Sequence, residues 1–138
     1  YIGGDGLTTD WEHAPTVMHD ALTHIKESLN SVFDNVPDFN ELLSIAYLPD
    51  QKMAFHSDDE RGVYPFVVGL SLGSDAAMMF RTKDSSLSGT RVFLTVNLKH
   101  GDILLMEGED FQNCFQHSVT PIGFRIAATA RLIEGETE

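Results

Sequence analysis

Short apolar runs, separated by turn residues, fill most of the chain from residue 42 onward. Glycine, proline, aspartate and serine between the runs are residues that tight turns favour. About eight such runs with frequent turn signals are typical of a β-sandwich or barrel. The pattern therefore predicts a mainly β domain, which we interpret as a jelly roll. The runs cover residues 42–48, 53–56, 66–73, 76–82, 91–98, 102–107, 114–119 and 124–133.

One segment before these runs has a different period. Between Pro15 and Phe33 the apolar residues recur at spacings of three and four, the pattern of an amphipathic helix of about five turns. Pro15 suits a first helical turn, and the turn residues 34–37 end the pattern. No repeat, low-complexity tract or internal linker interrupts the sequence, so we predict one domain over residues 1–138, with the N-terminal helix packed on the jelly roll.

The net charge and the cysteine count limit which kinds of partner and compartment the protein can have. A formal net charge of −12 disfavours a whole-surface electrostatic grip on nucleic acid, because such binding depends on Lys and Arg. Arg81, Lys83 and Arg91 are close in sequence, and we interpret them as a solvated hairpin tip. The single cysteine, Cys114, excludes an internal disulfide and favours a reducing compartment, so we expect an intracellular protein, nuclear or cytoplasmic. We expect no membrane span and no signal peptide.

Two histidines and an aspartate have the pattern of a metal site. His56 ends an apolar run and Asp58 follows two residues later, so in a strand both side chains would project from the same face. A third ligand from a distant strand would complete a facial triad, which leaves iron positions open for a cosubstrate and oxygen. We assign this role to His117, which lies in the run CFQHSV. The residues alone also allow two unrelated, partly buried histidines.

Two arginines of the last run have the spacing of an anion site. Arg125 and Arg131 are six residues apart and would share one face of a strand, with Ala127 and Thr129 between them. The opposite face is fully apolar and suits the core. A guanidinium group can donate two parallel hydrogen bonds to a carboxylate, so this face could anchor a diacid such as 2-oxoglutarate. Two exposed arginines on an edge strand are the alternative.

Several strings in the chain resemble one known family. In their order and spacing, these strings resemble the AlkB-type Fe(II)/2-oxoglutarate-dependent dioxygenases over roughly residues 39–131. The string HSDDE and the paired arginines are the parts most specific to this family. The resemblance implies a double-stranded β-helix, in agreement with the predicted jelly roll. The strings are FNELLSIAYLPDQKMAFHSDDE (39–60), GLSLG (69–73), MMFRTK (78–83), LKHGDILLMEG (98–108), His117 and RIAATAR (125–131).

The resemblance implies both the cofactors and the metal ligands. The family uses Fe(II), 2-oxoglutarate and O₂ to oxidise an unactivated C–H bond, and a hydroxylated N-methyl group is lost as formaldehyde. His56, Asp58 and His117 correspond to the iron ligands. Asp59 and Glu60 correspond to acidic residues beside the substrate base, although a solvated loop is an alternative interpretation of this pair.

Cosubstrate contacts are implied in the same way. Arg125 corresponds to the arginine that pairs with the distal carboxylate of 2-oxoglutarate, and Arg131 to a second arginine close to the aspartate ligand. Tyr47 corresponds to a tyrosine that hydrogen-bonds the cosubstrate, with a core aromatic as the alternative. Two positions depart from the family, because Ile45 and Ala127 stand where asparagines are usual. Both departures remove polar contacts near the cosubstrate.

The implied substrate is a methylated base in DNA or RNA, which such enzymes flip into a pocket. Methylated nucleic acid is therefore the expected partner, and we expect the protein to act as a monomer. The nucleotide-recognition lid of the family precedes the helix, and we interpret residues 1–14 as its remnant. Two alternatives remain: the same oxidation on a protein or small molecule, and a non-catalytic jelly-roll binding module.

Overall fold

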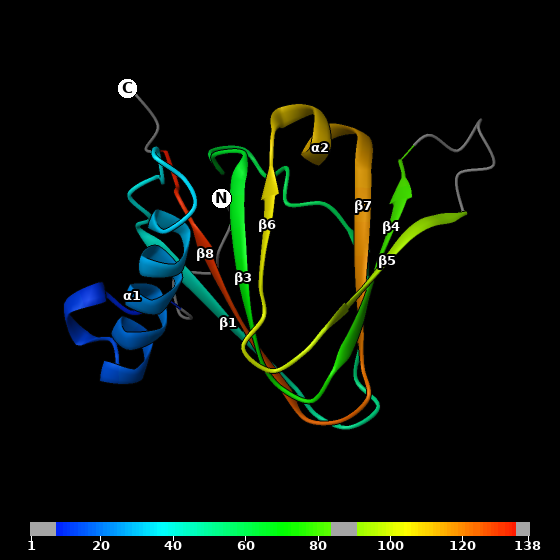
Figure 1. Ribbon diagram of the computed structural model, residues 1–138, viewed down its shortest axis with the longest axis horizontal. Coiled ribbons are helices and arrows are strands. Elements are labelled where there is room, and N and C mark those ends of the chain that lie inside the picture. The colour runs from blue at the N-terminus through cyan, green and yellow to red at the C-terminus, as the bar shows by residue number, and fades with distance from the viewer. Residues whose placement is uncertain (1–7, 84–90, 135–138) are drawn as a thin grey trace.

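The computed structural model describes residues 8–83 and 91–134, and Figure 1 shows how their elements are arranged. All the predicted runs form strands, so the expectation of a mainly β fold with an N-terminal helix is confirmed. In chain order the elements are the 3-10 helix η1 (Trp11–His13), α1 (Thr16–Asn30), β1 (Glu41–Tyr47), β2 (Met53–His56), β3 (Phe66–Gly73), β4 (Ala76–Thr82), β5 (Val92–Leu98), β6 (Ile103–Glu107), α2 (Glu109–Cys114), β7 (Phe115–Pro121) and β8 (Arg125–Arg131).

The strands form two four-stranded antiparallel sheets. One sheet has the order β1-β8-β3-β6 and the other the order β2-β7-β4-β5. Chain neighbours such as β1 and β2, or β7 and β8, belong to different sheets, so the chain crosses repeatedly between them. Figure 1 shows the sheets converging where β1 leads into β2 and separating toward α2. This is the double-stranded β-helix that the sequence predicts.

Helix α1 covers the outer face of the first sheet (Figure 1). Its buried residues are Leu22, Ile25 and Leu29, which follow the spacing of three and four that predicted the helix. They pack in one cluster with Ala128 and Ala130 of β8. Burial of this apolar stripe is what holds the helix on the sheet. The other buried members of the cluster are Phe39, Phe66, Val68 and Leu70.

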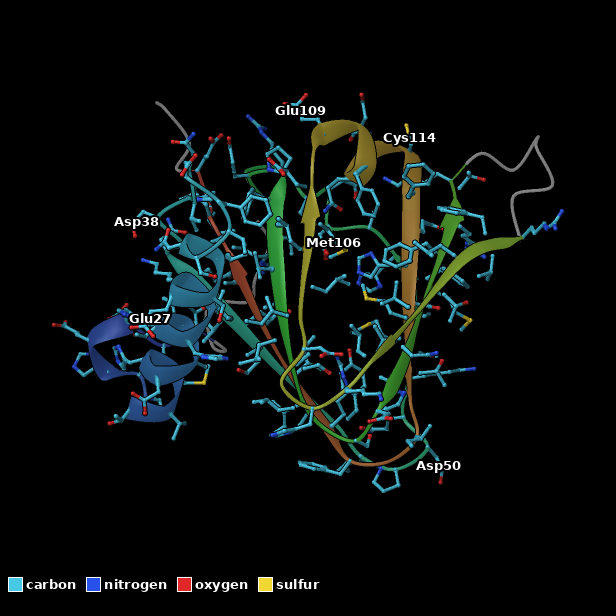
Figure 2. All side chains as sticks on the ribbon, in the orientation of Figure 1. Glu27, Asp38, Asp50, Met106, Glu109 and Cys114 are labelled. Atoms are coloured by element: carbon cyan, nitrogen blue, oxygen red, sulfur yellow. The ribbon has the colours of Figure 1, made fainter. Side chains whose placement is uncertain are left out.

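A second apolar cluster lies between the two sheets. Because neighbouring residues of a strand face opposite sides, Val67 joins this inner cluster while Val68 faces α1. Figure 2 shows side chains filling the space between the sheets, with Met106 of β6 among them. This inner cluster supports the walls of the site described below. Its buried members are Val67, Ala76, Met78, Phe80, Leu98, Met106 and Val119.

The ends of some elements differ from the sequence prediction. Helix α1 ends at Asn30 rather than at Phe33, and Phe33 is exposed. Helix α2 was not predicted, because a six-residue helix is under two turns long and shows no apolar period. Of the predicted lid remnant, residues 1–7 lie outside the described part of the chain, and η1 lies in the rest. None of the described helices is both long and apolar enough to span a membrane.

Ile25→Ala should lower the free energy of unfolding by about 2–5 kcal/mol, because it leaves a cavity between α1 and the sheet. Ile25 is fully buried, at 0% exposure. Val17→Ala is the matched control in the same helix, since Val17 is 69% exposed, and it should change stability by less than about 0.5 kcal/mol. Urea denaturation measures both variants. Equal, small effects would contradict the packing of α1 on β8.

Candidate metal centre

His56, Asp58 and His117 converge on one point. His56 of β2 and His117 of β7 are register partners, and their ring centroids are 4.2 Å apart. The Asp58 carboxylate lies 3.9 Å from His56 Nε2 and 3.6 Å from His117 Nε2. One ligand atom from each residue lies within 4.8 Å of the others. Two imidazoles and one carboxylate in this arrangement are the donor set of a facial iron triad.

The route by which Asp58 reaches the site differs from the one inferred from the sequence. Strand β2 ends at His56, and Asp58 lies beyond it in a loop rather than in the same strand. The sequence therefore correctly predicted that the side chains of His56 and Asp58 lie close together, but the reason given, that both belong to one strand, was wrong. The loop turns the carboxylate toward both imidazoles, and the antiparallel ladder between β2 and β7 brings those imidazoles together.

Burial and hydrogen bonding prepare both imidazoles to ligate a cation. His56 Nδ1 lies 2.8 Å from the carbonyl oxygen of Ala54, so as a donor to that oxygen it leaves Nε2 with a free lone pair. Burial, and then the neighbouring His56, lower the pKa of His117 to about 4, so this imidazole is neutral at neutral pH. Burial raises the pKa of Asp58, while His56 and Arg131 oppose that shift. A bound cation would favour the ionised carboxylate.

The triad opens into a cavity of about 230 Å³ between the two sheets. Both predicted arginines, Tyr47 and Glu60 also line this cavity, and most other lining side chains are apolar. Gly69 lines it too, and a Cβ added there would meet nothing within 4 Å, so the wall beside it is open. The apolar lining residues are Leu43, Ile45, Met53, Met78, Leu98, Leu104, Met106, Val119 and Ala127.

Arg125 is a buried cation with no carboxylate beside it in the described part of the chain. It is 4% exposed; its Nε donates to Ser71 Oγ at 2.9 Å, and its Nη1 has no hydrogen-bond partner among described residues. The guanidinium carbon lies 5.4 Å from the ring centroid of Tyr47, which is also buried. Burial lowers the pKa of Arg125, and Tyr47 partly opposes this. A buried, incompletely bonded guanidinium fits an anionic ligand such as a carboxylate.

Arg131 has a protein partner instead. Its Nε donates to Glu41 Oε2 at 2.6 Å, and Glu41 is its register partner on β1. Burial raises the pKa of Asp58, and the charge of Arg131 opposes this rise, so Arg131 acts at the triad end of the cavity. The two arginines share a face, as the sequence predicts, and this face lines the cavity rather than solvent.

The structure separates the two acidic residues that follow the triad. Asp59 accepts hydrogen bonds from Lys83 Nζ and Ser57 Oγ and lines an outer cleft rather than the cavity. Glu60 lines both the cavity and the cleft. The interpretation of the basic residues as a solvated hairpin tip was wrong for Lys83 and for Arg81, which donates to Gln116.

Two functional contacts were missed by sequence reasoning. Ser71 accepts a hydrogen bond from Arg125. The sequence feature that could have indicated this contact is a polar residue within the otherwise apolar strand β3. Gln112 of α2 accepts a hydrogen bond from the backbone N–H of Asp58 at 3.3 Å. Nothing local in the sequence links Gln112 to Asp58, because the two residues are 54 positions apart.

Comparisons with known proteins agree with this geometry. The family model described as the 2OG-Fe(II) oxygenase superfamily matches residues 7–132. The solved structure of OsALKBH1 is 21% identical, with a TM-score of 0.56, over 86% of this chain and 65% of that chain. This chain therefore spans less than two thirds of the OsALKBH1 chain, and over that part the two share a fold. No curated protein matches the chain.

Two other solved structures show weaker likeness. A cupin superfamily protein from Desulfitobacterium hafniense DCB-2 is 12% identical, with a TM-score of 0.42, over 72% of this chain and 84% of its own. Drosophila melanogaster CENP-C bound to CAL1 is 12% identical, with a TM-score of 0.46, over 83% of this chain and 98% of its own.

Asp58→Ala should weaken divalent metal binding by more than about 100-fold, because loss of a residue that merely supports a ligand already costs 10–100-fold. Titration of the metal-free protein with Co(II), followed by absorption, measures the affinity. Asp59→Ala is the matched control, since the Asp59 carboxylate pairs with Lys83. Binding that is unchanged in Asp58→Ala, or lost equally in both variants, would contradict the triad.

Proposed function

The chain belongs to the 2OG-Fe(II) oxygenase superfamily, and from this membership we propose that it is an Fe(II)/2-oxoglutarate-dependent dioxygenase with His56, Asp58 and His117 as iron ligands. The cofactors of this family are Fe(II), 2-oxoglutarate and O₂, as the sequence predicts. The sequence resemblance to such dioxygenases is confirmed by the family model and by the fold shared with OsALKBH1.

One observation carries the proposal. A three-ligand metal constellation and a buried arginine with an unpartnered Nη1 line the same cavity. When bound, Fe(II) and 2-oxoglutarate supply the oxidation of a C–H bond by O₂, with release of succinate and CO₂. Arg125 and Tyr47 would receive the distal carboxylate of 2-oxoglutarate, and Arg131 would keep the Asp58 carboxylate in a positive field. The apolar walls would keep the reacting centre poor in water.

The proposed reaction is oxidative demethylation of an N-alkylated substrate, and the proposed substrate is a methylated base in DNA or RNA. Hydroxylation inserts one oxygen into a methyl C–H bond, and the resulting N–CH₂OH group separates into N–H and formaldehyde. The AlkB-type strings of the sequence support this substrate. Glu60 supports it as well, because this residue lines the cavity and its negative charge would attract a cationic methylated base.

A second candidate is the same oxidation on a protein side chain or a small molecule. The net charge of −12 opposes the approach of a polyanion, and the outer cleft beside the triad carries several carboxylates. A cationic N-methylated side chain would suit that surface. The carboxylates lining the cleft are Asp58, Asp59, Glu60, Glu109 and Glu134.

Succinate and formaldehyde formation will distinguish these functions. With Fe(II) and 2-oxoglutarate, we expect a single-stranded oligonucleotide containing 1-methyladenine to stimulate turnover above the uncoupled rate, with one formaldehyde released per succinate. An unmethylated oligonucleotide is the control. Stimulation by an N-methyl-lysine peptide instead would support the second candidate. Absence of any iron-dependent succinate formation would leave only a non-catalytic binding module.

Arg125→Ala should raise the 2-oxoglutarate concentration needed for half-maximal turnover by about 10-fold or more, because a charge-assisted pair contributes roughly 1.5–3 kcal/mol. Arg81→Ala is the control, because Arg81 pairs with Gln116 outside the cavity. Turnover at graded 2-oxoglutarate concentrations measures both. Co(II) binding should persist in Arg125→Ala, and an unchanged requirement for 2-oxoglutarate would refute the carboxylate assignment.

A further inference from the structure

Asp58 is the member of the triad that the sheets constrain least. His56 and His117 are paired in the ladder between β2 and β7, whereas Asp58 lies in the loop after β2. A facial triad needs its carboxylate at a fixed position relative to both imidazoles. The position of Asp58 must therefore be set by contacts outside the strands. The backbone N–H of Asp58 donates to Oε1 of Gln112 at 3.3 Å.

Gln112 is well placed to hold this loop. It is 4% exposed, and it belongs to α2, whose ends are marked by Glu109 and Cys114 in Figure 2. Its own backbone N–H donates to the carbonyl oxygen of Gly108. Helix α2 continues directly into β7, so Gln112 lies five residues before His117. One hydrogen bond thus links the loop of one ligand to the segment that carries another.

Aromatic packing keeps α2 in place. Phe111, the neighbour of Gln112, contacts Phe80 at a centroid distance of 5.8 Å and Phe115 at 5.4 Å. Phe80 in turn lies 6.0 Å from the ring of His117. The helix that presents Gln112 is therefore packed against the same inner cluster that surrounds the metal ligands, and Gln112 can act as a fixed acceptor.

Packing alone does not account for a glutamine at this position. Its Nε2 is buried and has no hydrogen-bond partner among the described residues. A buried donor without a partner is unfavourable, and an apolar side chain of the same length would avoid that loss. The feature that only the amide supplies here is the oxygen that accepts the Asp58 N–H.

We propose that Gln112 is a positioning residue of the metal centre, which fixes the Asp58 loop so that the carboxylate meets both imidazoles. It acts through Asp58, since it lines the outer cleft and does not line the cavity. This inference rests on the proposed iron site. Residues that orient a ligand in this way change metal affinity without touching the metal.

Gln112→Met tests the role, because methionine matches the length of glutamine but offers no comparable acceptor. In the metal-free protein titrated with Co(II), we expect the dissociation constant to rise about 10–100-fold and the d–d absorption of the bound ion to change. Gln112→Glu keeps an acceptor oxygen at the same reach and should recover most of the affinity. Without metal, amide exchange at Asp58 should be faster in Gln112→Met than in the parent protein.

Gln116→Met is the matched control. Gln116 lies next to His117 on the opposite face of β7 and accepts from Arg81, so its variant should bind Co(II) within about twofold of the parent. Unchanged affinity and unchanged Asp58 exchange in Gln112→Met would overturn the role, as would an equal loss in Gln116→Met. If the parent binds Co(II) and Asp58→Ala does not, the iron site stands even when Gln112 proves dispensable. A parent that binds no Co(II) overturns both.

Discussion

The alternation of side chains along β8 is the constraint on which both the core and the cavity depend. Ala128 and Ala130 face α1, and their small side chains let the apolar stripe of the helix lie against the sheet. The alternate positions place Arg125 and Arg131 in the cavity, at 4% and 3% exposure. A shift of one residue would exchange the two faces and bury both cations under the helix. The hydrophobic contact with α1 therefore also fixes the orientation of the arginines.

The two arginines reach their buried positions at different cost. Arg131 is compensated by Glu41, its register partner on the edge strand. Arg125 is held by Ser71 and lies near Tyr47, and neither of these offers a carboxylate. Burial of a charge is unfavourable unless it is paired. The fold thus maintains an incompletely compensated positive charge in the cavity, and the packing of the sheets supplies the stability that this requires. An anionic ligand would complete the pairing.

The sequence was sufficient for elements whose signals are local. Strand positions follow from apolar runs and turn residues. The pairing of His56 with His117 depends on the strand order of the second sheet, and it was expected from the family resemblance rather than from a local pattern. Contacts between loops were not predictable, because no periodicity joins residues such as Asp59 and Lys83 or Asp58 and Gln112. They depend on how the loop after β2 lies relative to β4 and α2. This is why the sequence could place Asp58 among the candidate ligands but assigned it to a strand rather than to a loop.

The two departures from the family pattern have a defined place in the cavity. Ile45 of β1 is the register partner of Ala127 on β8, and Ser71 of β3 is the partner of Ala127 on its other side. An aliphatic pair therefore lies next to Arg125 along the cavity-facing side of β8. Beyond them, Gly69 leaves the wall open. The side chains of Ile45 and Ala127 offer a ligand no hydrogen bonds, and polar ligand atoms placed against this pair would lose those they made with water. The part of a ligand that lies against this pair should therefore be apolar, as the methylene groups of 2-oxoglutarate are, with its charged ends near Arg125 and near the candidate triad.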